Sequence, residues 1–237
     1  MFRFLCFVGI CFAVYWFGLR EGCGTRGALA CPPAALEEGV GTTLDATEVC
    51  RDSGYLCAQG RNFQVARWEL DKGRLRIRVP AVEYYSGETG RRIREAVIEG
   101  IKVWDGHPFP LVIDSGKYTL RLWDIRVVWT QGMNNHAAGQ ARVGWQIKGK
   151  RLKLETDGMA VVIPPHAAGG VDDRLYDYIK AVAIHEMGHA LGVMWHSDST
   201  RDIMYAQMLP KTVPELSDRD LRTMEALYAL PNGAKVE

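Results

Sequence analysis

Neither sign of charge is in excess in this 237-residue chain, which has 29 lysines and arginines against 28 aspartates and glutamates. A nucleic-acid-binding domain typically gathers an excess of basic side chains on one face, so we expect no nucleic-acid partner. A hydrophobic fraction of 47% excludes an acidic disordered chain and is sufficient to bury a core. The chain also lacks internal repeats and heptad runs, which excludes solenoids and coiled coils.

The chain lacks an apolar run of the roughly 20 residues that a membrane-spanning helix needs. Its longest run, Phe4–Leu19, has 16 uncharged residues and is typical of the apolar part of a secretory signal, with a small-x-small cleavage site at Ala28–Ala30. Charged residues between 20 and 27 leave a retained N-terminal anchor open, and cleavage after Ala30 leaves a lipid-modified Cys31 open. Under each interpretation residues 1–30 direct the chain out of the cytoplasm, as a secreted, periplasmic or membrane-attached protein.

Cysteine is absent from the last 180 residues. In an oxidising compartment, the cysteines near the N-terminus predict local disulfides. Cys50 and Cys57, which enclose six residues, are the favoured pair. The absence of close CxxC pairs argues against a cysteine zinc site. Residues 31–67 are rich in glycine, alanine and cysteine without a clear period, so we predict a linker or a small disulfide-tied appendage there.

Regular periodicity begins near Trp68 and predicts a mixed α+β domain. Leu75, Ile77 and Val79 alternate with arginines, which is the pattern of a half-buried strand. Apolar residues at helical spacing over 89–104 predict an amphipathic helix. The other predicted elements are strands at 109–113, 120–129, 141–147 and 159–163, a helix at 172–191 that stops at Gly192, and a closing helix that starts with a capping-box pattern at Ser217 and Asp220.

Residues 185–189 have the sequence His-Glu-Met-Gly-His and fall in the helix predicted at 172–191. Positions four apart lie on the same face of a helix, so His185 and His189 can present two imidazoles to one metal ion. From its place after the first histidine, Glu186 can reach a water on the metal without binding the metal itself. Zinc prefers such nitrogen ligands and takes three protein ligands plus water at catalytic sites, so the pattern predicts a zinc site.

The third ligand is expected shortly after Gly192, where we favour His196 and keep Asp198 as the substitute. Trp195 is excluded because an indole nitrogen only donates. Met204 stands eight residues beyond His196. This string resembles the metzincin metallopeptidases, and within them the matrixins, whose signature is HExxHxxGxxH followed by a methionine turn. The chain departs from that signature by one extra residue before His196, which we interpret as a locally expanded turn.

The resemblance implies a zincin-like α+β fold with a twisted, mostly parallel five-stranded sheet, one antiparallel edge strand and three helices. It implies a catalytic domain at 68–237, after an export signal or anchor at 1–30 and an appendage at 31–67. An extended peptide is expected to lie beside the edge strand, for which the candidates are 141–147 and 159–163.

The resemblance also implies a secreted zinc endopeptidase that hydrolyses peptide bonds in protein or peptide substrates. The implied metal ligands are His185, His189 and His196. The implied general base is Glu186, which takes a proton from a zinc-activated water. His185, Glu186 and His189 match the motif residue for residue, whereas His196 comes one residue later than the motif places its third histidine.

Two rival interpretations stay open. The first is a non-catalytic zinc-binding protein on the same fold, impaired by the extra residue. The second is a zinc peptidase with a downstream glutamate ligand, Glu215 or Glu225. Some matrixins also hold calcium and a structural zinc, but His107, His136 and His166 are scattered along this chain, so calcium is left without a clear site.

Overall fold

The computed structural model describes residues 39–58, 60–85, 87–114, 123–133, 137–149, 151–208 and 214–237. The described residues belong to one compact unit. The predicted export segment, the four cysteines before Cys50, His136 and the start of the strand predicted at 120–129 lie outside the described residues. Within the described ranges, no helix has the length and apolar character needed to cross a membrane.

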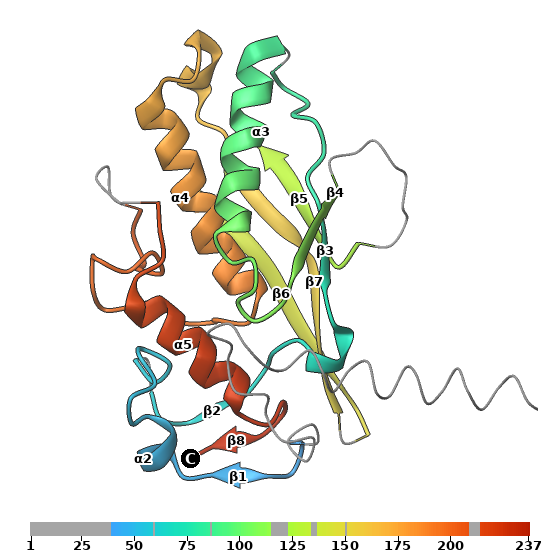
Figure 1. Ribbon diagram of the computed structural model, residues 1–237, viewed down its shortest axis with the longest axis vertical. Helices are drawn as coiled ribbons and strands as arrows, with labels where there is room; N and C mark the ends of the chain where they lie inside the picture. Colours follow the sequence, from blue (N-terminus) through green and yellow to red (C-terminus); the bar gives the residue numbers. More distant parts are fainter. Residues whose placement is uncertain are drawn as a thin grey trace, which may run out of the picture. The chain divides into compact units, whose positions relative to one another are not determined.

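A five-stranded sheet with the order β4-β3-β5-β7-β6 forms the centre of this unit (Figure 1). The pairs β3–β4, β3–β5 and β5–β7 are parallel, whereas β6 and β7 are antiparallel. The strands are β3 (Leu75–Arg78), β4 (Leu111–Asp114), β5 (Ile125–Thr130), β6 (Gly139–Lys148) and β7 (Arg151–Val162). The expected mostly parallel sheet is therefore confirmed, and the segment 141–147 belongs to its antiparallel edge strand.

The β6–β7 hairpin is longer than the sequence indicated. β7 begins at Arg151, well before the strand predicted at 159–163, and pairs with β6 as far as Lys148. Leu152 and Leu154 alternate with charged residues and are fully buried, so a half-buried strand continues through this region.

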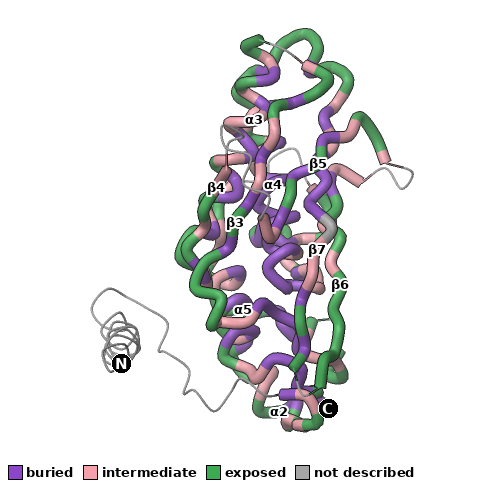
Figure 2. Tube along the Cα trace, turned by 90° about the vertical axis from the view of Figure 1, so that its right-hand side faces the viewer, coloured by how far each residue is buried: buried purple, intermediate pink, exposed green. Residues whose placement is uncertain are grey.

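Three long helices complete the expected fold: α3 (Gly87–Lys102), α4 (Asp173–Ala190) and α5 (Asp218–Ala229). Helices α3 and α4 lie side by side against one face of the sheet (Figure 1). In β5, the side chains of Ile125, Val127 and Trp129 are buried, whereas Val128 on the opposite face is 41% exposed. Figure 2 shows α4 largely buried and β6 largely exposed. The site-bearing helix is therefore packed inside the unit.

The sequence indicated the stop of α4 at Gly192 and the cap at the start of α5, and the structure adds a cap at the start of α4. The Asp172 carboxylate accepts a hydrogen bond of 2.8 Å from the Leu175 amide at the start of α4. Ser217 and Asp220 form the complete capping box of α5. After α4, Gly192 has a φ of +115°, a conformation that L side chains rarely adopt, so the helix stops there.

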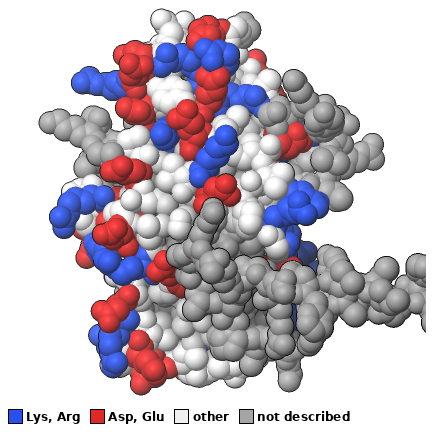
Figure 3. All heavy atoms as spheres, in the orientation of Figure 1, with Lys and Arg blue, Asp and Glu red and all other residues white. Residues whose placement is uncertain are grey.

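The polar face of α3 carries charges of both signs. Arg91 pairs with Glu88 and Glu95 on its own helix, and Arg92 reaches Asp173 of α4 at 2.9 Å. Figure 3 shows acidic and basic side chains interspersed over the face that carries α3 and α4. Such exposed pairs add little to stability, because solvent screens them.

The described part of the expected appendage packs into the same core as the predicted catalytic domain. A second sheet has the order β1-β8-β2 and joins this segment to the C-terminus of the chain. Tyr55, Leu56 and Val65 are buried in the common core. The described part of this segment therefore belongs to the folded unit. The sequence showed no period there because its strands are only two residues long. Its elements are β1 (Thr43–Leu44), the short helix α2 (Ala46–Val49), β2 (Phe63–Gln64) and β8 (Lys235–Val236).

The favoured disulfide pair is confirmed, since Cys50 and Cys57 are bonded at a sequence separation of 7. We expect replacement of both cysteines by alanine to lower the free energy of unfolding by about 2 to 3 kcal/mol, because the bond restricts the unfolded chain. Urea unfolding of the oxidised chain and of the Cys50→Ala, Cys57→Ala variant measures this difference. Equal unfolding midpoints in the two proteins would contradict it.

Candidate metal centre and active site

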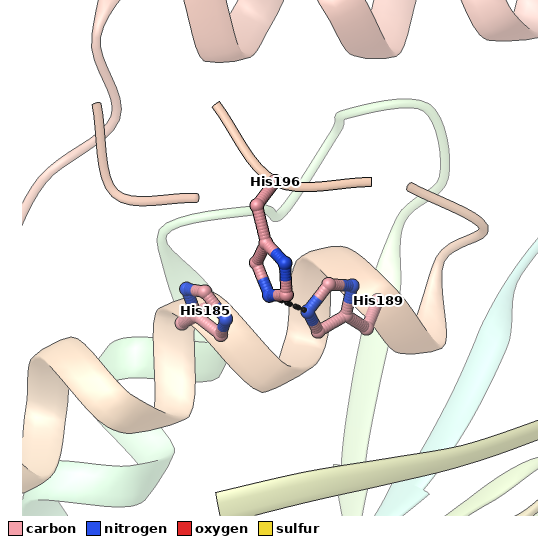
Figure 4. A group of neighbouring side chains, drawn as sticks. All are labelled: His185, His189 and His196. Atoms are coloured by element: carbon pink, nitrogen blue, oxygen red, sulfur yellow. Dashed lines mark hydrogen bonds between the residues drawn. The ribbon is translucent and has the colours of Figure 1, made fainter. Parts of the chain in front are cut away.

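Three histidine side chains meet at the C-terminal half of α4. His185 and His189 are one helical turn apart on this helix, and His196 faces them from the loop that follows (Figure 4). Their candidate ligand atoms all lie within 4.8 Å of one another. The His189 and His196 Nε2 atoms are 3.2 Å apart. The structure thus brings together the three histidines that the sequence singled out.

Backbone carbonyls orient the two helical imidazoles. The Nδ1 atom of His185 lies 2.8 Å from the Ile203 oxygen, and Nδ1 of His189 lies 2.5 Å from the Val193 oxygen. Since a carbonyl only accepts, each Nδ1 carries the proton and each Nε2 keeps a free lone pair. Tetrahedral zinc with bonds of about 2.0–2.1 Å holds its nitrogen ligands roughly 3.3 Å apart, close to the His189–His196 spacing. The donor set therefore fits zinc.

Burial keeps these imidazoles in the neutral form that binds metal. Desolvation lowers the pKa of His185 and of His196 below the usual value. The pKa of His189 falls to about 3, chiefly through burial and secondly through the neighbouring His185. Neutral imidazoles with free Nε2 lone pairs are ready to bind a cation without first losing protons.

Within the expanded turn, the residue before His196 packs against the N-terminal segment. Trp195 packs edge-on against Phe63 of β2, with ring centroids 4.8 Å apart and an interplanar angle of 67°. His196 faces the other histidines. The substitute ligand Asp198 instead forms a 2.7 Å ion pair with Arg219 and is exposed. The expanded turn after Gly192 thus presents His196, and not Asp198, to the centre.

The methionine turn packs against α4 between the two helical histidines. Met204 is fully buried, and a Cβ added at Gly188 of α4 would lie 2.5 Å from its sulfur. The Ser197 amide donates to the Met204 carbonyl at 2.8 Å, which ties the turn to the segment that follows His196. Glycine at position 188 thus leaves room for the Met204 side chain against the helix.

Asp220 has a second role that the sequence did not indicate. Besides capping α5, its carboxylate accepts hydrogen bonds from the Tyr55 hydroxyl at 2.7 Å and from the Ile203 amide at 3.1 Å. Ile203 is the residue whose carbonyl orients His185. Asp220 thus links three distant segments, and only the capping pattern at Ser217 was visible in the sequence because the other partners are far away along the chain.

Glu186 is buried between α4 and the edge strand. Its side chain is 6% exposed, and its Oε2 atom accepts a 2.7 Å hydrogen bond from the Ala141 amide of β6. A Cβ at Gly139 would lie 2.6 Å from the Glu186 side chain, so glycine gives it room. Burial raises the pKa of Glu186 to about 7, while the Ala141 hydrogen bond lowers it in part. A carboxyl group with such a pKa is suited to proton transfer near neutral pH.

A cavity of about 430 Å³ opens beside these residues. It is lined on one side by His185, Glu186 and His189 of α4, and on the other by residues 137–141 and Val143, which include the start of β6. β6 stands at the end of the sheet, and among the described residues no strand pairs with its second side, where the Ala141 amide points to Glu186 beside the cavity. The edge strand is thus 139–148, and the alternative at 159–163 is an inner strand.

The remaining candidates do not join the centre. Among the described residues, His185, His189 and His196 form the one group of His, Cys, Asp and Glu side chains arranged to hold a metal ion. Glu215 and Glu225 are exposed, the latter on α5. His107 and His166 belong to no such group within the described ranges. Calcium remains without an indicated site in this part of the chain.

A buried HExxH helix, a third histidine after a glycine and a methionine turn below them define the class of metzincin zinc peptidases. The family model described as matrixin matches residues 89–229, more than half of the chain. The chain therefore belongs to the matrixin family, which implies a zinc metallopeptidase. No curated protein matches the chain.

Proposed function

We propose that this chain is a zinc-dependent endopeptidase that acts outside the cytoplasm. The observation that carries the proposal is the convergence of three imidazoles and the Glu186 carboxylate on one cavity beside the free edge of β6. His185, His189 and His196 would hold the metal. An extended peptide would lie along the side of β6 on which no described strand pairs, and would add a strand to the sheet there.

Glu186 is proposed to act as the general base and then as the general acid. Bound zinc supplies polarisation of the scissile carbonyl and lowers the pKa of the attacking water. The Glu186 carboxylate takes a proton from that water at an Oε atom and passes it to the leaving amine. Burial raises the pKa of Glu186 in the metal-free chain, which favours retention of the proton until it reaches the leaving amine.

The alternative, an impaired zinc-binding protein, has less support. The extra residue that would impair the site is directed to Phe63, and His196 still faces the other two histidines. Glu186 also remains beside them within the same cavity. A binding protein would have no use for a buried carboxyl group poised for proton transfer.

We also propose that residues 1–30 export the protein, that 31–67 form a segment ahead of the catalytic domain, and that 68–237 are that domain. The disulfide between Cys50 and Cys57 supports an oxidising compartment. Attachment to a membrane through the first residues remains an alternative to release of a secreted protein.

Chelation is the direct test of the proposed activity. We expect the full chain to cleave an unfolded protein substrate at internal peptide bonds, to lose this activity on treatment with 1,10-phenanthroline, and to regain it when zinc is added back. Fragment masses distinguish internal cleavage from removal of terminal residues. Stoichiometric zinc in a folded chain that cleaves no substrate would instead favour the zinc-binding alternative.

A further inference from the structure

The third metal ligand is held differently from the other two. Backbone carbonyls orient His185 and His189 through their Nδ1 atoms. Among the described residues, no carbonyl orients the His196 ring in this way, and the ring contacts the other two histidines. The orientation of His196 therefore depends on how the chain is fixed on each side of it.

On the C-terminal side of His196, a polar network fixes the chain. The Ser197 amide donates to the Met204 carbonyl, and the Ser197 hydroxyl donates to Asp202. Asp202 is 3% exposed and also accepts from Ser217 and Arg219. This side is anchored within the methionine turn and the start of α5.

On the N-terminal side, Val193 is fully buried and its amide donates to the Gly188 carbonyl, and Trp195, the residue next to His196, contacts Phe63. Phe63 is in β2, which pairs with β8 at the C-terminus and so has a fixed place in the fold. Residues nearby strengthen the same junction: a Cβ at Gly192 would lie 2.8 Å from the Ala66 carbonyl, and the Trp68 indole donates to the Ala190 carbonyl at 2.9 Å. The segment 63–68 thus runs against the whole turn from the end of α4 to Trp195.

We propose that Phe63 is a positioning residue for zinc binding, which acts by holding Trp195 so that His196 faces His185 and His189. The inference rests on the proposed zinc site and deepens it. The extra residue in the loop gives the chain more freedom than a shorter turn would have, and the Phe63–Trp195 contact removes that freedom. Phe63 lies before the matched region 89–229, so the segment ahead of the matched region contributes to the metal centre.

The test is the zinc dissociation constant, measured by competition with a chromophoric chelator on the full chain. Phe63→Ala and Trp195→Ala are each expected to weaken zinc binding about 10-fold, as loss of groups that orient metal ligands typically does. The double variant is expected to bind zinc no more weakly than either single variant, since one contact is removed in all three. Phe63→Tyr, which keeps the aromatic ring, should bind zinc with the wild-type affinity.

Leu44→Ala is the matched control. Leu44 is a partly buried apolar residue of β1, which β8 separates from β2 in the same small sheet. It should lower the unfolding temperature of the zinc-free chain while the zinc affinity stays at the wild-type value. If Phe63→Ala fails to fold, Trp195→Ala and Trp195→Phe apply the same test from the loop side, with weakened binding expected only for alanine.

The results separate this inference from the proposed peptidase activity. Unchanged zinc affinity in folded Phe63→Ala or Trp195→Ala, or additive losses in the double variant, would overturn the positioning role even if the wild-type chain cleaves peptides. A coupled loss of zinc affinity would support it even if the wild-type chain cleaves none. A folded wild-type chain that binds no zinc would overturn both.

Discussion

Glu186→Gln is expected to reduce kcat/KM for peptide cleavage by about 10² to 10⁴-fold while the chain keeps its zinc. Glutamine has the shape of glutamate and its side-chain oxygen can still accept the Ala141 hydrogen bond, so the packing against Gly139 should persist. The amide cannot take a proton from the attacking water. Initial rates on a fluorogenic peptide, together with zinc content, measure the two effects separately.

Glu225→Gln provides the matched control, because Glu225 is an exposed glutamate on α5 and was one of the two downstream ligand candidates. It should leave both cleavage and zinc content unchanged. Activity retained in Glu186→Gln would show that another group transfers the proton. Loss of zinc together with activity would show instead that Glu186 supports the metal site.

His196→Ala is expected to weaken zinc binding by more than about 100-fold and to abolish cleavage, because it removes one of three proposed ligands. The loss should exceed the roughly 10 to 100-fold typical of groups that only orient a ligand. Asp198→Ala should retain zinc and activity, since Asp198 is exposed and pairs with Arg219. Equilibrium dialysis against zinc buffers and the same peptide assay distinguish the two variants.

The comparison also decides between the two candidates for the third ligand. Release of zinc by Asp198→Ala and retention by His196→Ala would reverse the assignment. In the absence of metal, both variants should unfold at a temperature similar to that of the wild-type chain. His196 is only partly buried, and exposed ion pairs such as Asp198–Arg219 contribute little to stability.

The parts of the fold that follow a local pattern were predictable from the sequence. The alternation at Leu75–Val79, the apolar stripe of α3 and the capping box at Ser217 each correspond to an observed element. Such elements are set by the spacing of apolar residues and by hydrogen bonds within a few positions. The fold of the segment 39–66 was not predictable from a local pattern, because its two-residue strands form only by pairing with the distant C-terminus.

The candidate site was likewise only partly predictable from the sequence. The spacing of His185 and His189 on one helix face, and of Glu186 between them, is a local property that the sequence determines by itself. The sequence also determines the matrixin signature and therefore the family. It left the third ligand open between His196 and Asp198, because the path of a loop with one extra residue depends on what the loop packs against.

Only the tertiary structure decided that path. Trp195 packs against Phe63, and Asp198 forms an ion pair with Arg219. With its neighbours held in this way, His196 faces the histidines of α4. The tertiary structure also placed Glu186 against Ala141 of the edge strand, where burial raises the pKa of its carboxyl group. These contacts join residues that are far apart in the chain, so no local periodicity encodes them, and they arise only when the separate elements pack into one core.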